Sequence, residues 1–244
     1  MKKLLIVIAL SSSALAHAMP TVGDTVSGSI SESTRAGNVV IPLPAGIWTV
    51  AYAGQFEGPR MQRANIDITG YSGEASNRFE NLVLVQTSGG ILKSILEIKY
   101  NLTNDLKTYA DNICSNKSVY FRDDYSLKLW KQRCLEVNAI SNPIPSDQTS
   151  KEQAIRSYLN GKNISLQSVF VTMNYGQYDR DGSRVEVKLS ENPAAFNLND
   201  KLEGGALSQW NKEAISKSPK KEEFMNNFIN FSEIYTEEIY KKFR

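Results

Sequence analysis

The residue types best suited to chemistry in this sequence gather between Cys114 and Cys134, the only two cysteines in the chain. The segment between them holds five basic residues against Asp123 and Asp124, and it is rich in aromatic residues. Interleaved cations and aromatic rings can bind polyanions or sugars through ion pairs and stacking. The candidate contact residues are Arg122, Trp130, Lys131 and Arg133. The alternative is an ordinary surface loop whose aromatic residues, Trp130 included, turn into the core.

The first 18 residues have the pattern of a secretory signal peptide of bacterial type. Lys2 and Lys3 precede an apolar run over residues 4–10, and small residues allow cleavage after Ala16 or Ala18. The apolar run is too short to span a hydrocarbon core of ~30 Å. We therefore expect residues 19–244 to be exported to the periplasm or beyond, with no membrane span after cleavage.

Cleavage also changes the charge of the protein. Removing residues 1–18 takes two of the 28 basic residues and no acid, which leaves 26 basic and 26 acidic residues. A balanced chain has no whole-molecule attraction to nucleic acid or anionic lipid. The sequence therefore predicts no nucleic-acid partner.

The two cysteines are predicted to form a disulfide, since export places them in an oxidising compartment. Closing a loop of this size contributes about 3 kcal/mol in the chain-entropy model. A metal site would need further His or Cys ligands, and the mature chain has none beyond His17 at its start. We expect neither a metal nor a cofactor.

The near absence of histidine excludes several enzyme classes. His17, the single histidine, lies at the cleavage boundary, which rules out Ser-His-Asp and Cys-His catalysis and histidine-ligated metals. An enzyme here would depend on carboxylates, Lys, Tyr, Ser or an oxygen-ligated metal. The acidic residues are scattered, and sequence does not supply the spatial separation that defines a catalytic pair, so no catalytic residue is assigned.

One motif has oxygen ligands at alternate positions, as calcium loops do. It runs from Asp179 through Asp181 and Gly182 to Ser183. The acidic ligand expected about twelve residues from the start of such a loop is missing, because Ser190 stands there. A plain Asp-Gly hairpin turn is the better interpretation.

Strand patterns recur between residues 47 and 189. Residues 47–53 are rich in aromatic and β-branched types, and residues 81–87 and 91–100 flank Ser88-Gly89-Gly90, which predicts an antiparallel hairpin. Residues 134–140, 168–175 and 184–189 alternate as strands do. Val39–Gly46 contains two prolines, which cannot donate ladder hydrogen bonds.

Helical patterns lie between and after these strands. The spacing of apolar residues predicts helices over residues 102–113, 149–160 and 207–215, and from Ser218-Pro219 to near the C-terminus. The last helix carries a broad aromatic stripe, which is typical of packing on a sheet and less often of docking on a partner or membrane.

The order of elements predicts an α+β fold, with a mostly antiparallel sheet packed by several helices and one disulfide-clamped loop. Residues 141–147 form the clearest linker and mark a candidate internal boundary. We nevertheless expect a single domain, because the hairpin after the linker could not stand without the first sheet.

Export, the lack of usable histidine and the lack of a catalytic motif together favour a non-enzymatic protein. We expect it to bind a partner or ligand, either an envelope protein or a glycan. The alternative is a carboxylate-dependent hydrolase of cell-envelope glycans, which would require acidic residues grouped in a pocket with at least one raised pKa.

Overall fold

The computed structural model describes eleven stretches of the chain. They are residues 19–34, 37–57, 61–62, 74–75, 77–103, 119–125, 132–145, 149–166, 169–179, 183–198 and 210–243. The strands are β1 (Thr25–Val26), β2 (Ser29–Thr34), β3 (Gly37–Pro42), β4 (Trp48–Glu57), β5 (Met61–Gln62), β6 (Glu74–Ala75), β7 (Arg78–Ser88), β8 (Ile91–Asn101), β9 (Phe121–Asp124), β10 (Gln132–Ile140), β11 (Phe170–Tyr178) and β12 (Arg184–Glu191). The helices are α1 (Thr149–Gly161), the 3-10 helix η1 (Pro193–Phe196), α2 (Lys212–Ser216) and α3 (Pro219–Lys242).

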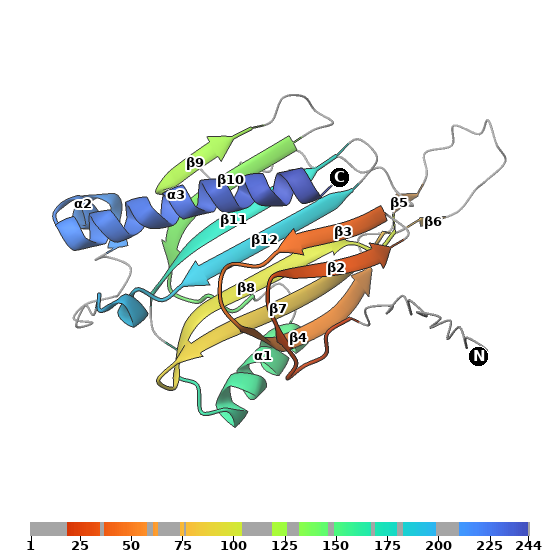
Figure 1. Ribbon diagram of the computed structural model, residues 1–244, viewed down its shortest axis with the longest axis horizontal. Helices are drawn as coiled ribbons and strands as arrows, with labels where there is room; N and C mark the ends of the chain where they lie inside the picture. Colours follow the sequence, from red (N-terminus) through yellow and green to blue (C-terminus); the bar gives the residue numbers. More distant parts are fainter. Residues whose placement is uncertain are drawn as a thin grey trace, which may run out of the picture.

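A single twisted sheet of eight strands organises the described part of the chain (Figure 1). Its strand order is β1-β4-β7-β8-β12-β11-β10-β9, and all neighbouring strands are antiparallel. The β7–β8 hairpin turns at Gly89 and Gly90, whose φ angles are 57° and 77°. Two successive positive φ angles favour glycine in a two-residue hairpin turn, which explains why Ser88-Gly89-Gly90 predicted this turn correctly.

The predicted α+β class is wrong. Strand accounts for 47% and helix for 29% of the described structure, and the fold is a large antiparallel sheet with three α-helices. The helix predicted to begin at residue 207 is α2, a helix of only five residues, and the helix predicted over residues 102–113 lies almost wholly outside the described residues. A strand near the prolines was also not predicted. This strand, β3, ends at Pro42 and pairs with β2.

The predicted disulfide-clamped loop is not part of the described fold either. Cys134 is buried in β10, but Cys114 lies outside the described residues, so the structure describes no disulfide pair. The described part of the chain holds no free cysteine. The Cys114–Cys134 disulfide stays a prediction.

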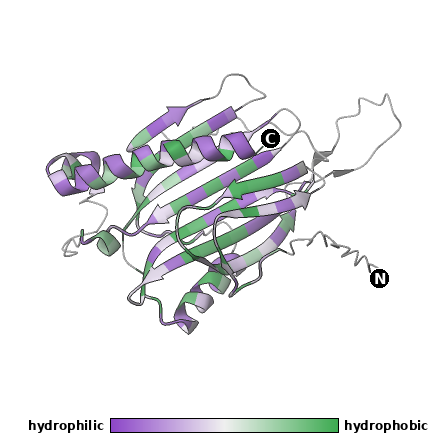
Figure 2. Cartoon of the chain, in the orientation of Figure 1, coloured by the Kyte–Doolittle hydropathy of each residue, from purple (hydrophilic) through white to green (hydrophobic). Residues whose placement is uncertain are grey.

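One face of the sheet, which we call the α3 face, is covered by α3 and by the β2–β3 hairpin (Figure 1). Alternate strand residues such as Leu84, Leu96 and Met173 meet Phe228 and Ile239 of α3 in the larger hydrophobic core. The alternation of hydrophobic and hydrophilic residues along the strands is visible in Figure 2. It follows from the two-residue period of a strand, which sends successive side chains to opposite faces.

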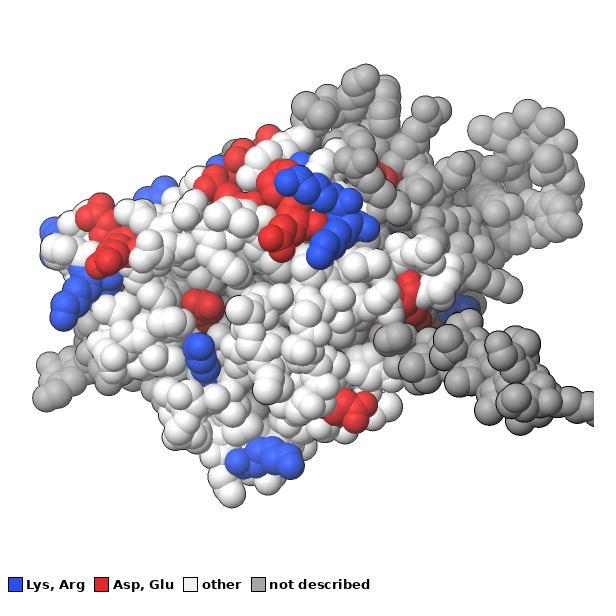
Figure 3. Space-filling view, viewed as in Figure 1, with Lys and Arg blue, Asp and Glu red and all other residues white. Residues whose placement is uncertain are grey.

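The long helix α3 uses its aromatic stripe for packing. Phe224, Phe228, Phe231 and Tyr235 form a continuous series of ring contacts with centroids 5.6 to 6.5 Å apart. The Tyr235 hydroxyl donates to the carbonyl oxygen of Pro42 at 2.9 Å, which ties α3 to the end of β3. The outer side of α3 carries much of the charge visible on this face (Figure 3), as expected of an amphipathic helix.

The opposite face, which we call the α1 face, is apolar only where α1 covers it. Ile155 and Leu159 of α1 pack on Val83, Val85 and Ile95 in a second, smaller core. Strands before and after residues 141–147 belong to the same sheet, since β8 pairs with β12. No helix in the described ranges is long and apolar enough to cross a bilayer.

Candidate binding face of the sheet

Beyond α1, the α1 face of the sheet is polar, and its residues lie in rows that cross the strands. The register aligns Glu97 of β8 with Lys188 of β12 and Lys188 with Asn174 of β11. Asn174 in turn faces Glu136 of β10, which faces Arg122 of β9. Side chains directly opposite on antiparallel strands are ~5 Å apart, so each row is a ladder of neighbouring polar groups. Acidic and basic members of this row alternate, with Asn174 at its centre.

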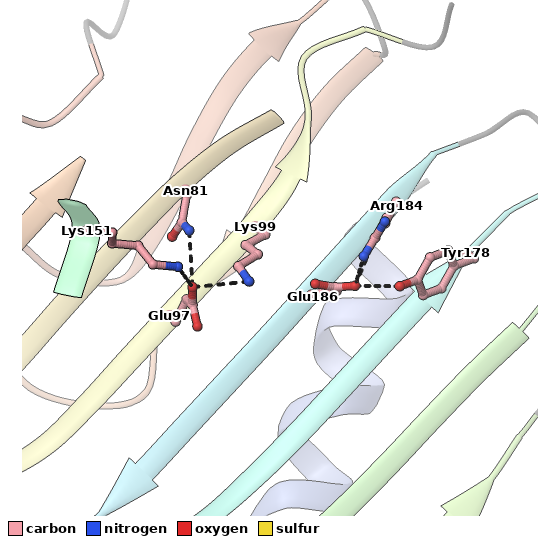
Figure 4. Close-up of polar contacts among 7 residues, drawn as sticks. All are labelled: Asn81, Glu97, Lys99, Lys151, Tyr178, Arg184 and Glu186. Carbon is pink, nitrogen blue, oxygen red and sulfur yellow. Dashed lines mark hydrogen bonds and ion pairs between the residues drawn. The ribbon is translucent and has the colours of Figure 1, made fainter. Parts of the chain in front are cut away.

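The buried end of this polar face is built around Glu97 (Figure 4). Its Oε1 accepts hydrogen bonds from Lys151 Nζ at 2.7 Å and from Asn81 Nδ2 at 3.1 Å. Lys99 Nζ lies 3.4 Å from the same oxygen. The side chain of Lys151 is 0% exposed and that of Glu97 is 7% exposed. A buried ion pair survives only with good geometry and additional hydrogen bonds, and both conditions are met here.

The sequence explains why Lys151 lies inside. Lys151, Ile155 and Leu159 are the buried residues of α1 and recur every four positions, so they share one side of the helix. The last two pack on the sheet, and the first is therefore brought over the sheet as well. This contact fixes α1 to β8, and we regard Glu97–Lys151 as a structural pair.

The next polar group on this face lies at Glu186 of β12 (Figure 4). Its Oε1 accepts from Arg184 Nε at 2.9 Å and from the Tyr178 hydroxyl, and it also contacts Arg184 Nη2. Burial by itself would raise the pKa of Glu186, but the Arg184 guanidinium and the Tyr178 hydroxyl bring it below its ordinary value. The same burial and the Glu186 carboxylate raise the pKa of Tyr178. Glu186 is thus held ionised and Tyr178 neutral.

The accessible part of the face is a strip of four residues, Arg122, Glu136, Asn174 and Lys188, which we call the polar strip. Asn174 and Arg122 are exposed, Lys188 is half-buried and Glu136 is buried. Arg122 Nε lies 3.3 Å from Glu136 Oε1. With strands ~4.8 Å apart, the strip crosses four strands over about 14 Å. It presents a guanidinium, an amide and an ammonium group in line.

The structure does not bring the predicted binding residues together. Arg122 belongs to the polar strip, whereas Arg133 alternates with Cys134 and points to the α3 face. Trp130 and Lys131 lie outside the described residues. Only Arg122 of the four is placed on an accessible polar surface.

Arg133 has a structural role that its sequence context did not indicate. Its Nη2 donates to Glu237 Oε1 at 2.7 Å and its Nε to the Tyr175 hydroxyl at 3.2 Å. Its guanidinium carbon lies 3.7 Å from the ring centroid of Tyr240 and 4.8 Å from that of Tyr125. Arg133 is 8% exposed. It therefore docks α3 onto β10 and β11.

A second unusual carboxyl lies on the α3 face. Glu80 of β7 is 3% exposed, and its Oε2 has no hydrogen-bond partner. Burial raises the pKa of Glu80 to about 7, with a further contribution from the Glu32 carboxylate and an opposing one from a hydrogen bond with Gln55. Within the described ranges, no group of three or more His, Cys, Asp and Glu side chains is arranged to hold a metal ion.

The motif around Asp179 joins β11 to β12, which pair as the predicted antiparallel hairpin. The backbone N–H of Asp179 donates to the Ser183 carbonyl at 2.9 Å. Residues 180–182, with Asp181, lie outside the described residues.

Sequence reasoning found part of the polar face and missed the rest. Glu97 and Lys99 stand two positions apart in the strand predicted over residues 91–100, and they share one side of β8. The polar rows were missed because they join strands far apart in sequence. The signal for Lys151 was present, since a lysine stands at the spacing of the buried residues Ile155 and Leu159.

Comparisons with known proteins assign no family to this chain. No family model matches it, and neither the curated proteins nor the solved structures contain a match. Its chemistry must therefore be argued from its own residues.

Proposed function

We propose that this chain is an exported, non-enzymatic protein that binds an envelope protein or a glycan through the polar strip. The observation that carries the proposal is the row Arg122–Glu136–Asn174–Lys188, which crosses four strands of a rigid sheet. Strand pairing fixes the backbone positions from which these side chains project. A ligand that offers hydroxyl, amide or carboxylate groups could bind there at little ordering cost.

The electrostatics of the α1 face favour binding over acid–base catalysis. Glu186 accepts hydrogen bonds from Tyr178 and Arg184, and its pKa lies below the ordinary value. A carboxyl group held ionised in this way is a poor general acid near neutral pH. Glu97 is likewise committed to Lys151 and Asn81.

Export rests on the sequence pattern of residues 1–18, which lie outside the described residues. Its test is expression of the full chain in a bacterium, followed by fractionation and N-terminal sequencing. We expect the protein outside the cytoplasm with residue 17 or 19 at its new N-terminus. An intact Met1 on protein retained in the cytoplasm would contradict export.

The binding proposal is tested by blocking the centre of the strip without removing a contact. In Asn174→Arg, a long charged side chain replaces the exposed amide between Lys188 and Glu136. Asn227→Arg makes the same change at an exposed position of α3 on the opposite face, so the two variants have equal charge. Each protein is immobilised and exposed separately to purified cell-wall glycan and to the protein fraction of an envelope extract.

We expect one of the two fractions to be retained by the parent and by Asn227→Arg, and at least tenfold less of it by Asn174→Arg. Equal retention by all three proteins, or no retention from either fraction, would refute the role of the strip.

A second candidate is favoured by one observation, the pKa of Glu80. A carboxyl group whose pKa burial raises to about 7, with a further contribution from Glu32, meets one requirement of a carboxylate-dependent glycan hydrolase. Its test is release of soluble fragments from purified cell-wall glycan by the parent and by Glu80→Gln. Hydrolysis by the parent that Glu80→Gln abolishes would favour the enzyme, and no hydrolysis by either would exclude it.

A further inference from the structure

The β2–β3 hairpin lies on the α3 face as a separate two-stranded sheet and has two differently anchored ends. At the end near Pro42, Ile30 and Ile41 are buried in the main core. That end is also fixed by the bond from the Tyr235 hydroxyl to Pro42. At the other end, where Thr34 pairs with Gly37, the contacts with the main sheet include a polar one.

This polar contact joins three strands that are distant in sequence. Glu32 of β2 accepts a hydrogen bond from the Tyr100 hydroxyl of β8, and Tyr100 is directly opposite Glu80 of β7. Glu80 is hydrogen-bonded to Gln55 of β4, its opposite residue on the other side. A half-buried carboxyl of the hairpin and a buried carboxyl of the sheet therefore lie where the two layers meet.

No described cation compensates these carboxyls. The charged group that acts on Glu80 is Glu32, and Val39, opposite Glu32 on β3, is apolar. The next residues on this side of β4 and β7 are the pair Glu57 and Arg78, both exposed. Glu80 is buried and Glu32 is half-buried, and like charges repel each other, so the closed arrangement favours the neutral form of Glu80.

We propose that Glu32, Glu80 and Tyr100 form a proton-controlled latch, which fastens the outer end of the β2–β3 hairpin to the sheet when Glu80 is protonated and loosens it when Glu80 ionises. Protonated Glu80 carries no charge, so its burial costs little. Glu32 then accepts the hydrogen bond from the Tyr100 hydroxyl. Ionised Glu80 repels Glu32 and gains hydration only when the hairpin moves away. The strands nearer Pro42 keep their apolar contacts and act as the fixed end.

The direction of the response follows from the raised pKa. An acid whose pKa is higher in the closed state than in the open state favours closure at low pH. That preference is lost as the pH rises from the ordinary value of 4.5 towards 7. Each pH unit in this window weakens closure by at most tenfold, because a single proton is involved. A protein exposed to the external medium would in this way adjust one surface to its surroundings.

The test is amide hydrogen exchange of the mature protein between pH 5 and pH 7.5, corrected for intrinsic exchange rates. We expect the protection of β2 amides from Ser31 to Thr34 to fall about tenfold or more across this range, relative to amides of β11. Glu80→Gln mimics the protonated acid and should keep its protection at both pH values. An equal fall in the variant, or no fall in the parent, would overturn the latch.

A second variant keeps the proposal testable if Glu80→Gln does not fold. Tyr100→Phe removes the hydroxyl that bonds Glu32 but leaves the aromatic ring in the core. It should show weakened protection of the same β2 amides already at pH 5. Protection equal to that of the parent at pH 5 would show that the contact does not fasten the hairpin.

Discussion

The ion pair between Glu97 and Lys151 gives the sharpest test of the fold described above. Replacing Lys151 by Met removes the ammonium group and keeps a long apolar side chain at a site with 0% exposure. Glu97 then keeps Asn81 Nδ2 at 3.1 Å and Lys99 Nζ at 3.4 Å. Breaking a buried pair by removing one partner costs about 3–5 kcal/mol.

Because Lys99 still compensates part of the charge, we expect the lower end of that range, about 3 kcal/mol. For a chain of this size a loss of about 1 kcal/mol lowers Tm by about 2–4 °C, so the expected fall is about 6–12 °C. Glu97→Gln should cost a similar amount, because it removes the carboxylate that Lys151 contacts. The double variant Glu97→Gln/Lys151→Met should recover part of the loss, since it leaves neither charge buried.

The measurement is urea unfolding of the parent and the three variants, followed by far-UV circular dichroism. The matched control is Arg156→Met, which breaks the Arg156–Glu152 pair in the same helix at the same distance of 2.7 Å. Its two side chains are 42% and 27% exposed, and this partly exposed pair within one helix should be worth about 0.5 kcal/mol or less. The reasoning is refuted if Lys151→Met costs no more than Arg156→Met, or if the two single losses simply add in the double variant.

Three further predictions concern other parts of the molecule. Glu80→Gln should flatten the pH dependence of stability, because the raised pKa of Glu80 costs the parent up to about 3 kcal/mol as pH rises from 4.5 to 7. Urea unfolding at pH 5 and pH 8 measures this change, and an equal loss of stability in parent and variant would contradict it. Arg133→Met should destabilise the protein by about 2–3 kcal/mol, since it removes charge-assisted hydrogen bonds to Glu237 and Tyr175; an unchanged urea midpoint would rule out its role in docking α3. Thiol titration of the denatured, unreduced mature protein should find no reactive thiol, and two titrating groups would disprove the Cys114–Cys134 disulfide.

Local features of the sequence predicted the elements that depend on local physics. The β7–β8 hairpin follows from Gly89 and Gly90, and α3 begins at Pro219 as the Ser218-Pro219 pair indicated. Helix α1 and strands β10 to β12 also agree with the periodicity of their apolar residues. These patterns need only the residues within one element or one turn.

What the sequence did not predict depends on contacts between distant segments. The pairing of β8 with β12 has no signature in either strand, so the polar rows on the α1 face were not foreseen. Arg122 and Arg133 were grouped because they are close in sequence, but their side chains lie on opposite faces of the sheet. Asp123 and Asp124 are residue types depleted in strands, yet they end β9, where pairing with β10 overrides the weak preference of the residues themselves.

The central seam between β8 and β12 has a consequence for how this chain folds. Within the main sheet, β4, β7 and β8 pair in chain order, and so do β9, β10, β11 and β12. In the described sheet, the two groups are joined by the pairing of residues 94–100 of β8 with residues 185–191 of β12. Closing so long a loop is entropically slow, so each half-sheet can assemble before the seam forms. During synthesis, the first half must keep its β8 edge unpaired until Glu191 has emerged, and in that interval the chain is most exposed to pairing with another copy.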